Sequence, residues 1–144
     1  MSTYLKSFIF SLAVLLAVSK SSAQQSDWAQ SKGWTLYSIH NRKIWSLPLD
    51  SLDQFPHKVL NNDSIIRFVK NASPLPAGTS PAWMGEYVAT CTLYKKKRKI
   101  AISTYGGFFF DQTEGKYYQL PQDVQVVWLN YLADFASMLR SPTK

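Results

Sequence analysis

The chain has 144 residues and a formal net charge of +7, from 16 lysines and arginines against 9 aspartates and glutamates. This length fits a single domain that can bury a core of its own. Cys91 is the only cysteine, which excludes an internal disulfide. It stands between two threonines, and we expect a small buried side chain in a strand rather than a reactive thiol or half of an intermolecular bridge.

The N-terminus has the pattern of a cleavable secretion signal. Lys6 precedes an uncharged apolar run over residues 8–18, and small and polar residues follow up to Ala23. The apolar run is well short of the roughly 20 residues that span a bilayer. We therefore expect cleavage after Ala23, which leaves residues 24–144 as one α+β domain that is periplasmic or secreted and has no transmembrane anchor.

The first part of the mature chain predicts one hairpin. Residues 24–32 are polar, and we expect them to be loose. Residues 34–39 alternate in the manner of a strand, residues 40–42 suit a turn, and residues 43–47 suit a second strand. The pattern therefore predicts a first hairpin that ends before Pro48.

Residues 50–69 leave strand and helix both open. Apolar residues recur at helical spacing, but Pro56 lies inside that pattern and should break or kink a helix. Residues 61–63 suit a turn, and the apolar run that follows is too short for its periodicity to decide. Three prolines and a glycine in residues 74–81 predict a loop.

Residues 85–118 are the part of the chain most typical of strands. They are rich in valine, threonine and aromatic residues, and the five basic residues 95–99 form a turn between two of the strands. Gly106 and Gly107 permit a tight turn or a bulge, because glycine accepts positive φ. We expect an antiparallel meander. The predicted strands are residues 86–94, 100–105, 108–110 and 116–120.

The last element is an amphipathic helix. Asp123 is a good N-cap, and an apolar stripe at helical spacing runs from Val124 to Leu139, before Pro142. The fold class is therefore predicted to be α+β. We expect an antiparallel sheet of about four to six strands, packed on one face by this C-terminal helix.

No set of residues predicts catalysis, a metal or a cofactor. His40 and His57 are the only histidines, and neither has a metal-ligating partner one helical turn away. The chain contains both a cysteine and histidines, but no motif pairs Cys91 with either histidine as a catalytic nucleophile and base. The sequence favours a protein that is not an enzyme, and a small exported hydrolase that uses Cys91 or a histidine is the alternative.

The basic run is the most distinctive feature of the sequence. Losing Lys6 and Lys20 with the signal lowers the net charge of +7 by two, and the basic run at residues 95–99 carries as much charge as remains. The run is either a solvated hairpin end whose lysines protect a sheet edge, or a contact for lipid headgroups, an anionic polysaccharide or an acidic protein surface. Export argues against nucleic acid.

The aromatic residues are the second feature, at 15% of the chain. Residues 108–110 are three consecutive phenylalanines, which cannot all face one side of a strand. Either both faces of the sheet are covered there, or Phe109 belongs to an exposed patch near Trp83 that binds a partner. The candidate binding residues are Lys95, Lys96, Lys97, Arg98, Lys99, Trp83 and Phe109.

The sequence therefore predicts an exported, non-enzymatic binding protein whose partner is a protein or an anionic envelope polymer. A structural accessory protein of the cell envelope is a further alternative to the hydrolase. The sequence does not indicate an oligomeric state.

Overall fold

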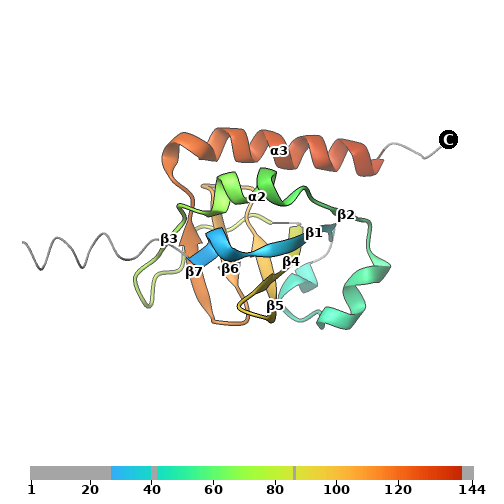
Figure 1. Ribbon diagram of the computed structural model, residues 1–144, viewed down its shortest axis with the longest axis horizontal. Helices are drawn as coiled ribbons and strands as arrows, with labels where there is room; N and C mark the ends of the chain where they lie inside the picture. Colours follow the sequence, from blue (N-terminus) through green and yellow to red (C-terminus); the bar gives the residue numbers. More distant parts are fainter. Residues whose placement is uncertain (1–26, 40–41, 86, 141–144) are drawn as a thin grey trace, which may run out of the picture.

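The computed structural model describes residues 27–39, 42–85 and 87–140. The predicted signal at residues 1–23 and His40 lie outside the described residues. The strands form one antiparallel sheet of seven, in the order β2-β1-β4-β5-β6-β7-β3. The α+β class is confirmed, with slightly more strands than the expected four to six (Figure 1).

The strands are β1 Lys32–Ser38, β2 His57–Val59, β3 Ser73–Pro74, β4 Tyr87–Leu93, β5 Lys96–Ile102, β6 Phe108–Asp111 and β7 Lys116–Gln119. The α-helices are α2 Asn62–Val69 and α3 Gln122–Arg140, and the 3-10 helices are η1 Asp27–Gln30, η2 Arg42–Trp45 and η3 Leu49–Gln54. The described part of the chain has no helix that is both long and apolar enough to cross a membrane.

The meander from β4 to β7 forms as the sequence predicts. Each of these strands pairs antiparallel with the next one along the chain. Gly106 and Gly107 have φ values of 68° and 65° in the turn between β5 and β6, where glycine avoids the strain of a side chain. A Cβ on Gly107 would also lie 2.6 Å from Cγ of Gln125, so α3 can pack closely over this turn.

The predicted first hairpin is wrong. Residues 42–45 form the 3-10 helix η2, and β1 lies between β2 and β4 in the sheet. Leu36 is buried among the residues of one sheet face, and Tyr37 and Ile39 among those of the other. β1 pairs with β2 on one edge and with β4 on the other, so it is an interior strand whose backbone groups find partners on both sides.

Residues 50–69 contain three short elements. Pro56 lies between η3 and β2, and its carbonyl accepts a hydrogen bond from the Ser38 N–H at 2.9 Å. The predicted turn at residues 61–63 is instead the start of α2. The Asn61 side chain caps this helix by accepting from the Ser64 N–H at 3.2 Å.

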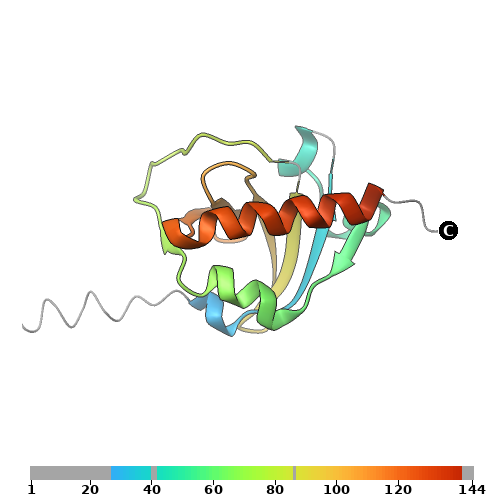
Figure 2. The same cartoon turned by 90° about the horizontal axis from the view of Figure 1, so that it is seen from above.

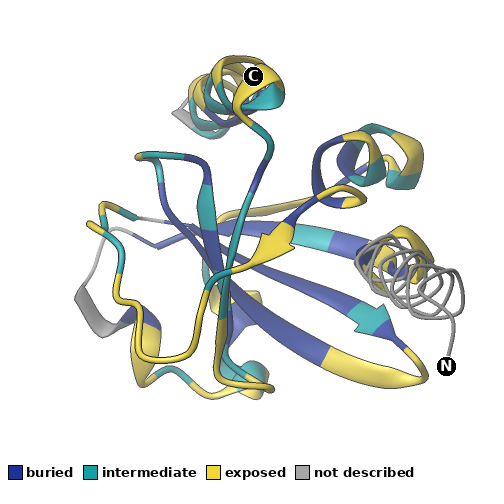
Figure 3. Cartoon of the chain, turned by 90° about the vertical axis from the view of Figure 1, so that its left-hand side faces the viewer, coloured by how far each residue is buried: buried dark blue, intermediate teal, exposed yellow. Residues whose placement is uncertain are grey.

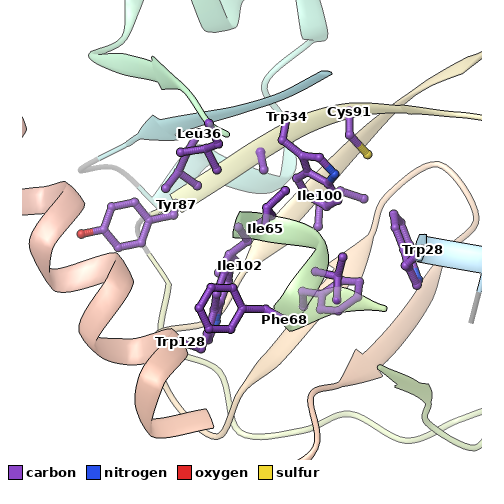
Figure 4. Close-up of a cluster of buried hydrophobic side chains, with 14 of the residues drawn as sticks. Trp28, Trp34, Leu36, Ile65, Phe68, Tyr87, Cys91, Ile100, Ile102 and Trp128 are labelled. Atoms are coloured by element: carbon purple, nitrogen blue, oxygen red, sulfur yellow. The ribbon is translucent and has the colours of Figure 1, made fainter. Parts of the chain in front are cut away.

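A separate cluster of buried side chains covers each face of the sheet. The larger cluster lies under α2 and α3 and includes Trp34, Ile65 and Trp128 (Figure 4). The smaller one contains Ile44 and Leu52, from η2 and η3, on the opposite face. In Figure 2, where the molecule is seen from above, α3 runs across the strands.

The three phenylalanines are explained by these two clusters. Phe109 is 2% exposed in the larger cluster, and Phe110 packs against the smaller one. Trp28 is also buried, with its ring centroid 5.3 Å from that of Phe109. Residues 27–30 form η1, so the expectation of a loose segment is wrong over those residues.

Candidate functional site

The turn between β4 and β5 has an unusual backbone. It consists of Tyr94 and Lys95, between the paired residues Leu93 and Lys96. The φ values of Tyr94 and Lys95 are 50° and 63°, as in the type I′ turns that normally take Asn-Gly. Holding residues with a side chain in this left-handed region costs about 1 kcal/mol or more each. The turn thus keeps two costly residues at an exposed position.

Exposed lysines gather at this end of the sheet. Lys95, Lys96 and Lys97 are exposed, and Lys32 at the start of β1 is exposed as well. Thr92 pairs with Lys32 on one side and with Lys97 on the other, so the two lysines share a face of the sheet. We call these four lysines the basic end; Figure 3 shows the exposed turn that forms part of it. Within the described residues, none of the four forms an ion pair.

Arg98 and Lys99 do not belong to the exposed turn. The expectation of a five-residue surface turn is wrong, since β5 already begins at Lys96, and Arg98 and Lys99 are moreover buried, at 6% and 7% exposed. Adjacent residues of a strand point to opposite faces, so the two side chains are buried on different sides of the sheet.

Arg98 is held by two carboxylates near the turn between β6 and β7. Its Nη1 lies 3.3 Å from Oδ2 of Asp111 and 2.6 Å from Oε1 of Glu114. Burial raises the pKa of Asp111, while N–H donation from Thr113 and Glu114 and the charge of Arg98 oppose that rise. These contacts give Arg98 a role in the fold rather than in binding.

Lys99 is held by backbone carbonyls on the other face. Its Nζ donates to the carbonyl of Ile44 at 3.1 Å and to the carbonyl of Leu47. Burial lowers the pKa of Lys99. No carboxylate of the described residues pairs with this ammonium group. An ammonium group has three N–H donors, so one remains after the two carbonyls.

A groove of about 410 Å³ opens beside Lys99. We call it the aromatic groove. Trp45 is 46% exposed there, and its ring centroid lies 5.3 Å from that of Trp83 and 5.3 Å from that of Phe110. Its lining residues are Trp45, Leu47, Pro48, Leu49, Lys99, Phe110, Gln112 and Thr113.

Lys97 of the basic end and Lys99 at the aromatic groove lie on one face of β5. Lys97 and Lys99 are two residues apart in this strand, so they point to the same side, about 7 Å apart along the chain. A ligand in the groove could therefore also contact Lys97.

The structure separates the predicted aromatic binding residues. Trp83 is partly buried and braces Trp45, whereas Phe109 is buried in the core and has no exposed face to offer a partner. Sequence reasoning missed Trp45, because residues 43–47 were expected to form a strand. No local pattern marks this tryptophan as exposed.

Cys91 and His57, the described residues among those considered for catalysis, do not form a site. Cys91 is 2% exposed, and burial together with the charge of Asp111 raises the pKa of its thiol to about 12. His57 is exposed, and its Nδ1 lies 2.8 Å from the carbonyl oxygen of Phe55. Over the described ranges, no three His, Cys, Asp or Glu residues are grouped so as to hold a metal ion.

A second exposed surface lies at the β2 edge of the sheet. The Ser38 N–H donates to the carbonyl of Pro56, and the Leu60 N–H donates to the carbonyl of Trp34, both at 2.9 Å. These two hydrogen bonds fix which backbone groups of β2 point toward β1. By this alternation the N–H and C=O groups of the residues on either side of Lys58 point away from β1.

A groove of about 420 Å³ adjoins this edge. Val59 and Met138 line it and are 71% and 56% exposed. We call it the edge groove. An exposed strand edge beside an apolar groove is suited to an extended peptide.

Comparison of the chain with protein-family models, with curated proteins and with solved structures found no match.

Proposed function

We propose that this is an exported, non-enzymatic binding protein that holds an anionic polymer of the cell envelope at its basic end. The observation that carries the proposal is the set of four exposed lysines, none of them ion-paired within the described residues, which the β1–β4–β5 register brings to one end of the sheet. Such a cluster of like charge attracts a polyanion.

The backbone of the turn supports binding over a merely solvated hairpin end. A soluble turn needs no left-handed tyrosine and lysine, because Asn-Gly gives the same geometry without the strain. Tyr94 is 58% exposed and stands beside the lysines, where an aromatic ring adds contact area for a ligand. Strain retained at an exposed position is typical of residues kept for a function.

Binding is also favoured over hydrolysis by the state of Cys91. A nucleophilic cysteine acts as its thiolate, and a buried thiol with a pKa of about 12 is protonated at neutral pH. His57 has no described carboxylate paired with it to orient its ring. A hydrolase would need groups that the described residues do not bring together.

The proposal is tested by adsorption to immobilised polygalacturonate and, in a separate arm, to anionic vesicles at low salt. The basic-end variant carries Lys95→Gln, Lys96→Gln and Lys97→Gln. The matched control carries Lys58→Gln, Arg67→Gln and Lys70→Gln, which removes the same charge from exposed residues of β2 and of the α2 end. Lys99 stays unchanged because it is buried.

We expect the parent and the control to adsorb to the polysaccharide, and the basic-end variant to adsorb much more weakly. Adsorption to vesicles alone would replace the polysaccharide with a lipid surface as the partner. Equal adsorption by the basic-end variant and the parent would return the lysines to a role in solubility and overturn the proposal.

A protein partner is the second candidate, and the β2 edge favours it. The outward N–H and C=O groups of His57 and Val59 could pair with an extended segment whose apolar side chain enters the edge groove. A structural accessory protein of the envelope could use the same edge.

The test of this candidate is a pull-down from native envelope extract with the parent and a Val59→Pro variant, which lacks one outward N–H. We expect a captured protein to be lost with the variant, and the β2 amides to be protected from hydrogen exchange in the complex. Capture that does not depend on Val59 would remove β2 from consideration.

A further inference from the structure

We propose that the aromatic groove is a subsite for one acidic sugar unit, a pyranose ring that carries a carboxylate, within the polymer that the basic end holds. This inference rests on the proposed function and adds the chemical class of the ligand. Three features of the groove carry it: a buried ammonium group, a braced tryptophan face and a polar rim.

The first feature is the charge of Lys99 at the wall of the groove. The side chain is only 7% exposed, yet its hydrogen-bond partners are the neutral carbonyls of Ile44 and Leu47. No described carboxylate pairs with this ammonium group. Buried charges are normally paired, because removing an unpaired charge from water is costly. A carboxylate in the groove would supply the missing charge and accept the remaining N–H.

The second feature is the exposed face of Trp45. The ring is 46% exposed, and the rings of Trp83 and Phe110 hold it from two sides at centroid distances of 5.3 Å. A braced ring loses little conformational freedom when a ligand packs on it. Its flat apolar face suits the C–H face of a pyranose ring.

The third feature is the pair of polar side chains at the rim. Gln112 lies 3.5 Å from the Ile44 carbonyl through its Nε2, which is a weak contact that leaves most of the amide free. Thr113 accepts from the Lys99 backbone N–H through its Oγ1 at 3.4 Å and can still donate its hydroxyl hydrogen. Both side chains can therefore hydrogen-bond the hydroxyl groups of a sugar.

The face of β5 that carries Lys99 also indicates where a neighbouring unit of the polymer lies. Lys97 stands on the same face as Lys99 and is exposed, so an acidic unit next to the one in the groove can contact the basic end on that side. A neutral glycan would leave Lys99 without a counter-ion, and a phosphate-rich polymer would not use the face of Trp45. An acidic polysaccharide uses both.

The experiment is a titration followed by nuclear magnetic resonance, with tri-galacturonate as the acidic probe and the neutral galactose trimer as its match. We expect tri-galacturonate to shift the signals of Trp45 and Phe110 and to bind about tenfold more tightly than the neutral trimer. Trp45→Ala should weaken its binding about tenfold, as truncation of an anchoring aromatic residue does. Lys99→Gln, which keeps an N–H donor for the carbonyls, should reduce the preference for the acidic probe to the part that the basic end supplies.

The outcomes separate this inference from the proposed function. If the parent adsorbs to polygalacturonate through the basic end but Trp45→Ala binds tri-galacturonate as the parent does, the groove is not the subsite and the proposed function stands. If the parent does not adsorb to the polymer at all, the proposed function fails. If Lys99→Gln does not fold, the Trp45→Ala result decides, because Trp45 is half-exposed and outside the buried core.

Discussion

At the scale of single residues, Arg98 and Lys99 are neighbours in β5 that are buried on opposite faces and held by different segments. Arg98 pairs with Asp111 and Glu114, and Lys99 donates to carbonyls that lie 55 and 52 residues away in the chain. Each of the two residues therefore ties β5 to another part of the fold.

Replacing Arg98 by Met should destabilise the protein by about 3 kcal/mol, because it leaves Asp111 buried without its cation. Unfolding in urea measures the change. Lys97→Met is the matched control, since Lys97 is exposed in the same strand, and it should change the free energy of unfolding by less than about 0.5 kcal/mol. Equal midpoints for the two variants would show that the ion pair does not support the fold.

The buried thiol of Cys91 should lower the free energy of unfolding at high pH. The pKa of its thiol is about 12 in the fold against an ordinary 9.0, so above pH 9 the unfolded chain releases a proton that the folded chain keeps. The Cys91 contribution is fully present below pH 9 and is lost as pH rises toward 12, by up to about 1.4 kcal/mol per pH unit.

Unfolding of the parent and of Cys91→Ala at pH 8 and pH 10.5 measures this contribution. Burial also raises the pKa of Tyr118 and Tyr131, which both proteins share, so the comparison isolates the thiol. The parent should lose more stability than the variant over this interval. The same loss in both proteins would mean that the thiol is not protected by burial.

At the scale of elements, the turn between β4 and β5 holds Tyr94 and Lys95 at left-handed φ values. Replacing Tyr94 by Asn and Lys95 by Gly should relieve the strain of two left-handed residues and raise the free energy of unfolding by about 1 kcal/mol. For a domain of this size that corresponds to about 4 °C in melting temperature. A lower melting temperature for the double variant would show that Tyr94 and Lys95 stabilise the turn.

The elements that the sequence predicted well are those formed by neighbours in the chain. The strands from β4 to β7 each pair with the next, and α3 has an apolar stripe of its own, so local patterns were sufficient. The elements that it missed depend on distant partners. The carbonyls of Ile44 in η2 and of Leu47 after it accept hydrogen bonds from Lys99, and β1 pairs with β4, which is distant in the chain.

The candidate site was predicted in part for the same reason. The basic run is visible in the sequence, but the burial of Arg98 and Lys99 depends on groups that other segments bring to β5. Lys32 joins the basic end only through the register of β1 on β4. Trp45 lines the groove because η2 packs on the sheet face of the smaller cluster, and no local sequence pattern predicts this packing.

At the scale of the whole molecule, the proposed function requires export. The predicted cleavage after Ala23 should give a mature protein whose first residue is Gln24. Mass spectrometry of the protein recovered outside the cytoplasm checks this directly. An intact N-terminus on protein that stays in the cytoplasm would contradict export. Such a protein would not meet an envelope polymer.

The salt dependence of polygalacturonate binding tests the central claim most directly. Neutralising a polyanion with lysines releases bound counter-ions, and for nucleic acids each contact adds about 0.7–0.9 to the slope of log affinity against log salt. We predict a steep slope for the parent and for the Lys58, Arg67 and Lys70 control, and a slope smaller by about 2 for the Lys95, Lys96 and Lys97 glutamine variant. Equal slopes and equal affinities for all three proteins would contradict binding at the basic end.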